Sequence, residues 1–250
     1  MRKYDVYADT SIGKVRTSNE DQAVVLVNEA TSHILGVVCD GMGGAKRGDY
    51  ASKLASDMLK EAFLKGGPIY RLSPKYWSKR IVRSINKCVF GFGDKNEEYA
   101  HMGTTLVSAL LLDNKLVVTN VGDSRAYIST PQGIRQITVD HTYVEFLYKT
   151  GQISRNEMET HHQKHVLMNA LGTFPSVNVD VFSVDYAGET ILLCSDGLYN
   201  SVGEREIWAI LQTSSSAKTK TQQLIKIANA NGGPDNIAIC IIQEEGLSND

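Results

Sequence analysis

The sequence predicts an α+β fold with antiparallel strands. Three short apolar segments, residues 104–112, 116–121 and 125–129, follow one another with only tight turns between them, and Asp113-Asn114 forms the first turn. Two amphipathic segments with helical spacing occur in succession before these strands, whereas a parallel βαβ fold would place one helix after each strand. Both observations favour antiparallel sheets with helices packed against them.

The first half of the chain is expected to form strands and then two helices. Alternating or continuous apolar residues predict strands at residues 3–9, 22–28 and 34–40. Apolar residues three and four positions apart predict a helix over 49–65, which ends before a Gly-Gly pair. Ser73-Pro74 supplies an N-cap and a first-turn proline for a second helix through Cys88, with two later glycines as weak points.

A polar helical insert, residues 140–170, is expected to interrupt the strands of the second half. Asp140 would cap its first helix, which runs through Leu147. Ser154 and Glu157 would form a capping box for its second helix.

The remaining elements return to strands and helices. The periodicity predicts strands at residues 179–184, 189–194 and 237–242, and helices at 201–211 and 219–230. Ser201 and Glu204 would cap the first of these helices. Residues 247–250 have the composition of a loose tail.

The composition sets the size and the environment that we expect. A chain of 250 residues with 42% hydrophobic residues can bury a full core, and this length is compatible with one domain or two. The net charge of −2 argues against a nucleic-acid partner, which would select a basic surface. No apolar run approaches the roughly 20 residues of a membrane span, and the N-terminus lacks a signal-peptide core. We therefore expect a soluble, cytoplasmic protein without a membrane partner.

The four cysteines support the same compartment. They lie mostly within apolar runs, without CxxC pairs or metal-ligand spacing, at Cys39, Cys88, Cys194 and Cys240. Reduced thiols in a core are typical of cytosolic proteins, so we expect all four in that state.

Aspartates recur at the ends of predicted strands. Asp40 follows the apolar strand 34–40 and precedes a glycine, Asp196 repeats this pattern, and Asp123 and Asp235 vary it. An isolated Asp-Gly pair is most often a plain turn, but four such aspartates exceed what turns need. If they converge, each pair of carboxylates about 4 Å apart repels by about 4 kcal/mol at an effective dielectric constant of 20. Such a cluster must take up protons or hold cations.

Two further groups of polar residues are candidates for the same site. The loop at residues 12–21 contains Arg16, Glu20 and Asp21, which are either solvated loop charges or additional ligands with an arginine for an anionic substrate. His161, His162 and His165 follow closely in the insert. Without a cysteine or carboxylate at ligand spacing, this cluster indicates a polar surface near a lid rather than a zinc site.

Five segments, in order, resemble motifs of the metal-dependent type 2C protein phosphatases: RTSNED (16–21), CDGMGG (39–44), GDSRAY (122–127), CSDGL (194–198) and GPDNIA (233–238). The DHTYVEFL and NALG segments also resemble the flap region of the bacterial members. The resemblance implies a four-layer α-β-β-α sandwich of two antiparallel sheets flanked by helices. It also implies a single phosphatase domain over residues 1–246, with a flap at about 140–170.

The resemblance implies metal-dependent hydrolysis of phosphoserine and phosphothreonine, by direct attack of a water between two divalent cations. Asp40 would bridge the two ions, the Gly41 carbonyl and Glu20 would complete one, and Asp196 and Asp235 would hold the other. Asp21 would act through a water, Asp123 would bind a weaker third ion, and Arg16 would bind the phosphate oxygens. Apart from the resemblance, the polar insert and its clustered histidines lead us to expect that His161 contacts the substrate. An all-oxygen set of ligands selects Mn²⁺ or Mg²⁺ over zinc. The expected partners are phosphoproteins and an opposing serine/threonine kinase, and the protein is expected to be a monomer.

Two positions depart from the pattern. Met42 stands where eukaryotic members carry a histidine that is proposed as a general acid, and Ala45 stands where many bacterial members have histidine. The source of the proton for the leaving oxygen is therefore open.

Two other classes of protein fit the sequence less well. Residues 41–48, GMGGAKRG, would have to serve as the phosphate loop of a nucleotide-binding protein, but they match neither GxxxxGK[ST] nor GxGxxG. A catalytically inactive interaction module would lack ligands, and none of the central ones is missing.

Overall fold

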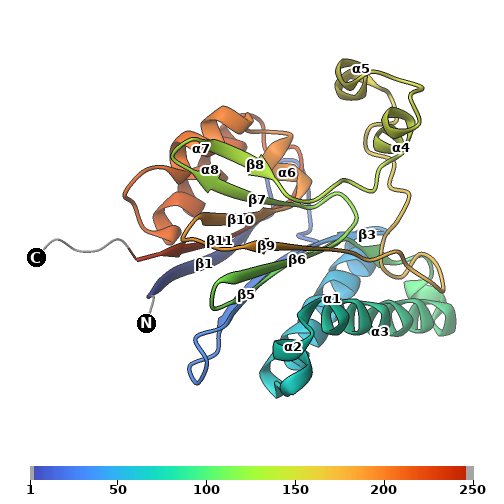
Figure 1. The fold of residues 1–250 in the computed structure, drawn as a ribbon. Coiled ribbons are helices and arrows are strands. Elements are labelled where there is room, and N and C mark those ends of the chain that lie inside the picture. Colours follow the sequence, from blue (N-terminus) through green and yellow to red (C-terminus); the bar gives the residue numbers. More distant parts are fainter. Residues whose placement is uncertain (1–2, 246–250) are drawn as a thin grey trace, which may run out of the picture.

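The computed structural model describes residues 3–245, and Figure 1 shows two sheets stacked between two groups of helices. The predicted tail at 247–250 lies outside the described residues. Sheet one has the strand order β1-β11-β10-β7-β8, and its strands are Tyr4–Ser11, Ile237–Glu244, Thr190–Cys194, Arg125–Thr130 and Gly133–Gln136. Sheet two has the order β2-β3-β5-β6-β9, with strands Asp21–Val27, Ile34–Met42, Leu106–Leu112, Lys115–Val121 and Asp180–Asp185. The short β4, Gly103–Thr104, pairs with β3.

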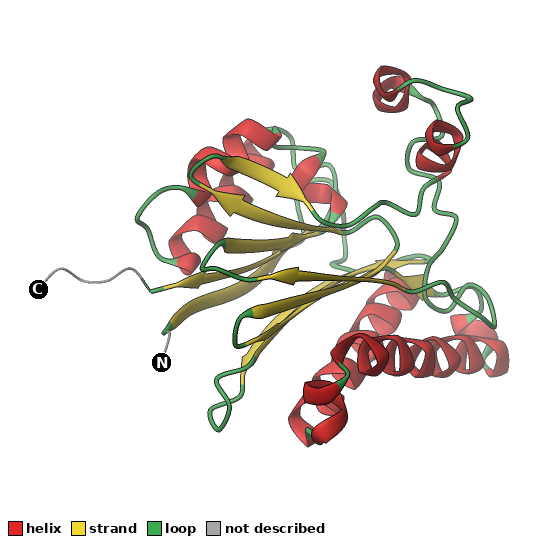
Figure 2. Ribbon diagram, in the orientation of Figure 1, coloured by secondary structure: helices red, strands yellow, loops and turns green. Residues whose placement is uncertain are grey.

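The pairings between the described strands are antiparallel, as predicted. Figure 2 shows that helices cover the outer side of each sheet. Sheet two is covered by α1 (Ala45–Lys65), α2 (Pro68–Leu72) and α3 (Pro74–Lys95), and a single 3-10 turn follows at Glu97–Tyr99. Sheet one is covered by α6 (Asp196–Tyr199), α7 (Glu204–Leu211) and α8 (Ala217–Ala230). The insert contains α4 (Tyr143–Lys149) and α5 (Arg155–Thr160).

Three apolar clusters hold these layers together. One lies between the sheets and includes Val38, Leu193 and Ile242. The others join sheet two to α1 and α3, and sheet one to α6, α7 and α8. The predicted four-layer α-β-β-α fold is therefore confirmed. None of the helices within residues 3–245 is long and apolar enough to cross a membrane.

The predicted elements are present, but several boundaries differ. Helix α1 begins four residues earlier than predicted, and α3 continues seven residues beyond Cys88, through both glycines, because its apolar side packs on sheet two. Four short elements were not predicted, namely α2, the 3-10 turn, β8 and α6, and the predicted strand at 104–112 is divided into β4 and β5. Cys39, Cys194 and Cys240 are buried free thiols as expected, but Cys88 is exposed, so the prediction of four core thiols is wrong at that position.

Of the predicted helix caps in the second half of the chain, one is confirmed and two are wrong. The capping box of Ser154 and Glu157 is confirmed, with the Ser154 N–H donating to Glu157 Oε2 at 2.7 Å. The prediction that Asp140 caps α4 is wrong: the Thr142 hydroxyl accepts from the Glu145 N–H instead, at 3.3 Å. The cap by Ser201 and Glu204 is also wrong, because α7 begins at Glu204 after Gly203, without a side-chain cap.

The predicted N-cap of α3 is confirmed in position but not in its hydrogen bond. Ser73 is the N-cap residue of α3 and Pro74 occupies the first turn, but the Ser73 side chain makes no capping hydrogen bond. Helix α3 thus begins at the predicted residue, but without the predicted capping hydrogen bond.

The two sheets are in close contact at Gly36 of β3. A Cβ atom added there would lie 2.9 Å from Cys240 Sγ, 3.2 Å from Ile242 Cδ1 and 3.3 Å from Leu193 Cδ1. All three neighbours belong to sheet one and are fully buried. The two sheets can pack at this distance because residue 36 is a glycine and has no side chain. The relative position of the sheet ends depends on this contact.

We expect Gly36→Val to lower the free energy of unfolding by about 1–3 kcal/mol, because it overpacks the layer between the sheets. Gly91→Ala in α3 is the matched control, since a Cβ atom there meets nothing within 4 Å. It should stabilise the protein by up to about 1 kcal/mol through helix propensity. Urea unfolding measures both changes, and an unaltered stability of Gly36→Val would contradict the close sheet contact.

Candidate active site

A cavity of about 260 Å³ lies where the ends of both sheets meet. Carboxylates from separate parts of the chain line it: Glu20 before β2, Asp40 in β3, Asp123 after β6, Asp196 after β10 and Asp235 before β11. The lining also includes Arg16, Gly41, Met42 and His165. The fold thus brings together the aspartates that the strand-end pattern singled out.

Asp21 lies directly behind this cavity. It opposes Asp40 in the antiparallel register of β2 and β3, and its side chain is 2% exposed. The Ser195 hydroxyl donates to Asp21 Oδ2 at 2.6 Å. The Asp40 N–H donates to Thr105 Oγ1 at 2.9 Å, so the backbone that carries the central carboxylate is held from the neighbouring strand.

The cavity is strongly acidic. Burial, followed by the neighbouring carboxylates, raises the pKa of Asp40 well above its usual value. Burial also raises the pKa of Asp21 to about 7, although the hydrogen bond from Ser195 acts in the opposite direction. The pKa of Asp123 is raised to about 8 and that of Asp196 to about 6, first by burial and then by other carboxylates. Keeping these groups charged together requires positive charge in the cavity.

Arg16 supplies one positive charge at the edge of the cavity. Its guanidinium donates to Asp235 Oδ2 at 2.8 Å, and its side chain is 53% exposed. The charge of Asp235 raises the pKa of Arg16 further. Because Arg16 is exposed and held by a single carboxylate, it can exchange this partner for an anionic substrate.

The loop that carries Arg16 and Glu20 is fastened by Asn236. Its side-chain amide donates to the carbonyls of Ile12 and Ser18, each at 2.9 Å, and its Oδ1 accepts from the Glu20 N–H at 2.9 Å. Ser195 has a similar role, because its hydroxyl also accepts from the Ala238 N–H at 2.8 Å. The sequence analysis quoted both residues within motifs but assigned them no role.

Close backbone packing shapes the other wall. The Gly41 N–H donates to the Glu20 carbonyl at 3.1 Å. A Cβ atom at Gly41 would collide with the Gly48 carbonyl, and one at Gly48 would collide with Glu20 Oε2. Only glycines at 41 and 48 allow the first turns of α1 to lie over the end of β3 and the Glu20 carboxylate.

The donors suit hard divalent cations. The wall offers carboxylate oxygens and a backbone carbonyl, without cysteine, and hard ions such as Mg²⁺ and Mn²⁺ prefer oxygen. Among residues 3–245, no three His, Cys, Asp or Glu side chains converge on one point as metal ligands. Mg²⁺ does not require three protein side chains as ligands, because it keeps several bound waters and is held by one or two carboxylates. The residues present therefore fit ions with water-rich shells.

The insert contributes a histidine to the cavity. His165 Nδ1 lies 3.9 Å from Asp196 Oδ2. His161 instead stacks on His162 with ring centroids 4.6 Å apart, and it does not belong to the described lining of the cavity. A substrate contact by His161 stays a prediction.

A second cavity, of about 520 Å³, continues from Asp123 and His165 between the insert and the edge of sheet one. Arg125 lies in its wall, where it donates to both oxygens of Asp140 at 2.7–3.1 Å and stacks 3.5 Å above the Tyr199 ring. This ion pair explains why Asp140 does not cap α4. It also ties the start of the insert to the strand beside Asp123.

Comparisons with known proteins agree with this geometry. The family described as Protein phosphatase 2C matches residues 10–232. The chain is 36% identical over 238 residues to the serine/threonine phosphatase stp of Listeria monocytogenes, with 94% of each chain covered. It is 32% identical over 234 residues to the protein phosphatase PhpP of Streptococcus pneumoniae, with 93% of this chain and 94% of that protein covered.

A solved structure shows the same fold. The crystal structure of the serine/threonine phosphatase Stp1 from Staphylococcus aureus matches with a TM-score of 0.89 and 36% identity, over 98% of this chain and 96% of that one. The family match also implies that activity depends on metal. The chain therefore belongs to the protein phosphatase 2C family, as a serine/threonine protein phosphatase of the bacterial type.

Proposed function

We propose that this phosphatase hydrolyses phosphoserine and phosphothreonine in proteins with two divalent cations, Mn²⁺ or Mg²⁺, held in the acidic cavity. The observation that supports this proposal is the convergence of five carboxylates from distant segments on one cavity of about 260 Å³, with Arg16 at its edge. When bound, such ions lower the pKa of a water and offset the charge that develops on the phosphoryl group.

Each carboxylate has a proposed place. Asp40, which pairs with Asp21 where the ladder between β2 and β3 ends, would be shared by both ions. The Gly41 carbonyl and Glu20 would complete one ion, and Asp196 and Asp235 would hold the other. Asp21, behind the wall and hydrogen-bonded to Ser195, would act through a water, and Asp123 would hold a weaker third ion.

The phosphate itself would be bound by Arg16. Its planar guanidinium can donate two parallel hydrogen bonds to phosphate oxygens, which a lysine cannot do. Substrate binding would then replace the bond from Arg16 to Asp235. Met42, on the cavity wall, offers no proton to the leaving oxygen, so that proton must come from another group.

The insert at about residues 140–170 would act as a flap of a single phosphatase domain and select the phosphopeptide. Its support is the second cavity, which separates α4 and α5 from the edge of sheet one and opens beside Asp123. A protein with this activity requires a serine/threonine kinase to make its substrates, so we infer that it opposes one, in the cytoplasm.

The metal proposal predicts that hydrolysis of a phosphothreonine peptide requires added Mn²⁺ or Mg²⁺ and stops on chelation. Asp40→Asn should lower kcat/KM by about 10³-fold, because it removes the shared ligand and about 4 kcal/mol of transition-state stabilisation. The affinity for Mn²⁺, measured by calorimetry, should be lower in the same variant. Full activity of Asp40→Asn, or of a chelated preparation shown to be metal-free, would rule out the proposal.

For Arg16, we expect Arg16→Ala to raise KM more than it lowers kcat, because the phosphate is bound in both the ground state and the transition state. Arg16→Lys should restore only part of the affinity, since lysine lacks the planar guanidinium that donates two parallel hydrogen bonds. Steady-state kinetics on the same peptide measure both constants. If KM is unchanged in Arg16→Ala, the residue is only a loop charge.

For the flap, the double variant His161→Ala/His162→Ala should change the order of preference among phosphopeptides. Its kcat/KM on a small aryl phosphate should change by less than about threefold, because the aryl phosphate does not reach the insert. His165→Ala is the comparison, and it should lower activity on both substrates because its ring faces Asp196. Equal losses on both substrates in the double variant would assign it a structural role instead.

A further inference from the structure

The outer side of α3 carries a row of positive charges. Its inner side, with Trp77, Val82, Ile85 and Val89, is buried against sheet two. Its exposed positions are mostly basic: Lys75, Lys79, Arg83 and Lys87 follow one another four residues apart, and Arg80 lies three residues before Arg83. We call these five residues the α3 basic face. Because three- and four-residue spacings align on a helix, their charges lie along one side of α3.

Within the part of the chain that the structure describes, no carboxylate pairs with this face. Among residues 3–245, none of its five cations has a carboxylate oxygen within 4.0 Å. The neighbouring α1 differs, because Lys53 and Lys60 both pair with Asp57, and Lys65 pairs with Glu61. Like charges four residues apart weaken a helix, so the arrangement on α3 opposes stability and calls for a partner.

The charge is also segregated within the chain. Residues 68–95, which form α2 and α3, contain seven Lys or Arg and one acidic residue, whereas the rest of the chain contains 19 Lys or Arg and 27 Asp or Glu. The net charge of −2 therefore conceals one basic side on an otherwise acidic molecule. Such a molecule turns that side toward an anionic surface.

Apolar side chains project beside the same face. Leu72, at the end of α2, is 81% exposed, and Tyr76, between Lys75 and Lys79 on α3, is 60% exposed. Ile69 of α2 is 42% exposed. An acidic solute would be held by the cations alone, whereas a bilayer offers both anionic headgroups and an apolar layer beneath them.

We propose that the α3 basic face, with Leu72 and Tyr76, docks the phosphatase on a bilayer that contains anionic lipid. The cations would bind the headgroups, and the two apolar side chains would enter the boundary of the acyl chains. Figure 1 shows α2 and α3 on the opposite side of the molecule from α4 and α5, so docking leaves the insert free. The proposal departs from the expectation that the protein has no membrane partner, which relied on the lack of a membrane-spanning apolar run and of a signal-peptide core.

The test is partition of the full chain onto vesicles of phosphatidylcholine with phosphatidylglycerol, compared with vesicles of phosphatidylcholine alone. Each basic residue near an anionic bilayer contributes about fivefold, so Lys79→Gln/Arg80→Gln/Arg83→Gln should lower the partition coefficient about 100-fold. The wild-type protein should bind only the vesicles with phosphatidylglycerol, and binding should fall with added salt.

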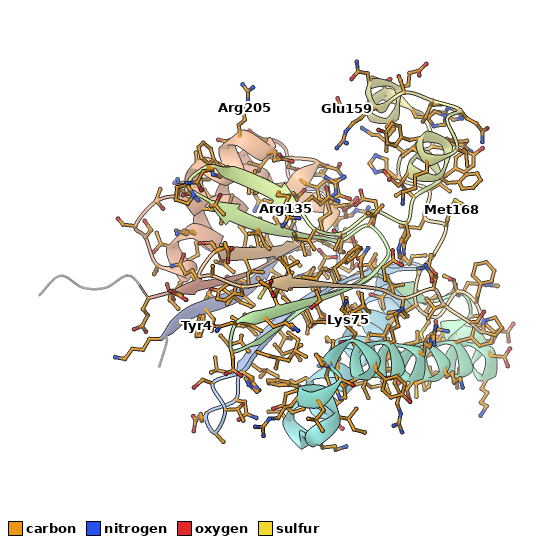
Figure 3. All side chains as sticks on the ribbon, viewed as in Figure 1. Tyr4, Lys75, Arg135, Glu159, Met168 and Arg205 are labelled. Atoms are coloured by element: carbon orange, nitrogen blue, oxygen red, sulfur yellow. The ribbon has the colours of Figure 1, made fainter. Side chains whose placement is uncertain are left out.

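A matched control changes the same charge elsewhere. Figure 3 labels Lys75 on the helices of sheet two and shows Arg135 and Arg205 on the other side of the molecule. Arg135→Gln/Arg205→Gln/Lys226→Gln should keep the partition coefficient within about threefold of wild type. Both triple variants should keep wild-type hydrolysis of an aryl phosphate, which shows that they fold.

Two further measurements separate lipid from other anions. Leu72→Ser/Tyr76→Ser should weaken binding to the anionic vesicles and leave binding to polyglutamate unchanged. Cys88 is the exposed cysteine on α3, and the three others are fully buried, so an environment-sensitive fluorophore on Cys88 should change its emission on the anionic vesicles.

The proposal is overturned if the wild-type protein does not bind the anionic vesicles, or if both triple variants bind equally. It is also overturned if the α3 variant loses only its binding to polyglutamate or duplex DNA, which would identify an acidic polypeptide or a nucleic acid as the partner. Vesicle binding without any response of the Cys88 fluorophore would place the contact on another side of the molecule.

Discussion

Repulsion among carboxylates where the two sheets end is the constraint on which this structure depends. Asp21 and Asp40 are direct neighbours in β2 and β3, and Asp123, Asp196 and Asp235 close the cavity around Asp40. Burial raises the pKa of Asp40, and each further carboxylate raises it more. The fold tolerates this group because its backbone is held by long-range hydrogen bonds, and because the positive charge of Arg16 reaches Asp235.

The sheets supply the rigidity that holds these charges in place. Gly36 allows the sheets to pack closely, Ser195 links the end of β10 to Asp21 and to β11, and Asn236 fastens the loop of Glu20. The acidic residues therefore sit on strand ends or on loops tied to them. Under the proposed function, cations would relieve the repulsion, and the same rigid arrangement would fix their spacing.

Much of this arrangement could be predicted from the sequence, because local patterns determine it. Apolar runs that end in Asp-Gly identified the strands and the carboxylates together, and the Ser154-Glu157 box identified a helix start. The partner of Asp140 could not be predicted, because Arg125 lies on strand β7 and forms an ion pair with Asp140 in place of the local cap. The roles of Ser195 and Asn236 were missed for the same reason: Asp21 and Glu20, to which they bond, lie more than 170 residues away along the chain. The exposure of Cys88 depends on which side of α3 packs on the sheet.

Charge distribution separates the two ends of the molecule. Figure 1 shows α4 and α5 of the insert on one side of the molecule and α3, which carries the basic face, on the other, although the whole chain has a net charge of only −2. A total charge averages over these regions and predicts neither of them. The structure shows which charges are paired, as on α1, and which are left for a ligand.

The most direct test of the carboxylate constraint is urea unfolding of the wild-type protein and of Asp40→Asn, each with and without Mn²⁺. Without Mn²⁺, the variant should be more stable by about 1 kcal/mol or more, because one repelling charge is gone. With Mn²⁺ at 100 times its Kd, the wild type should gain about 2.7 kcal/mol and the variant much less. A variant that is less stable than wild type without metal, and equally stabilised by Mn²⁺, would contradict the central role of charge repulsion at Asp40.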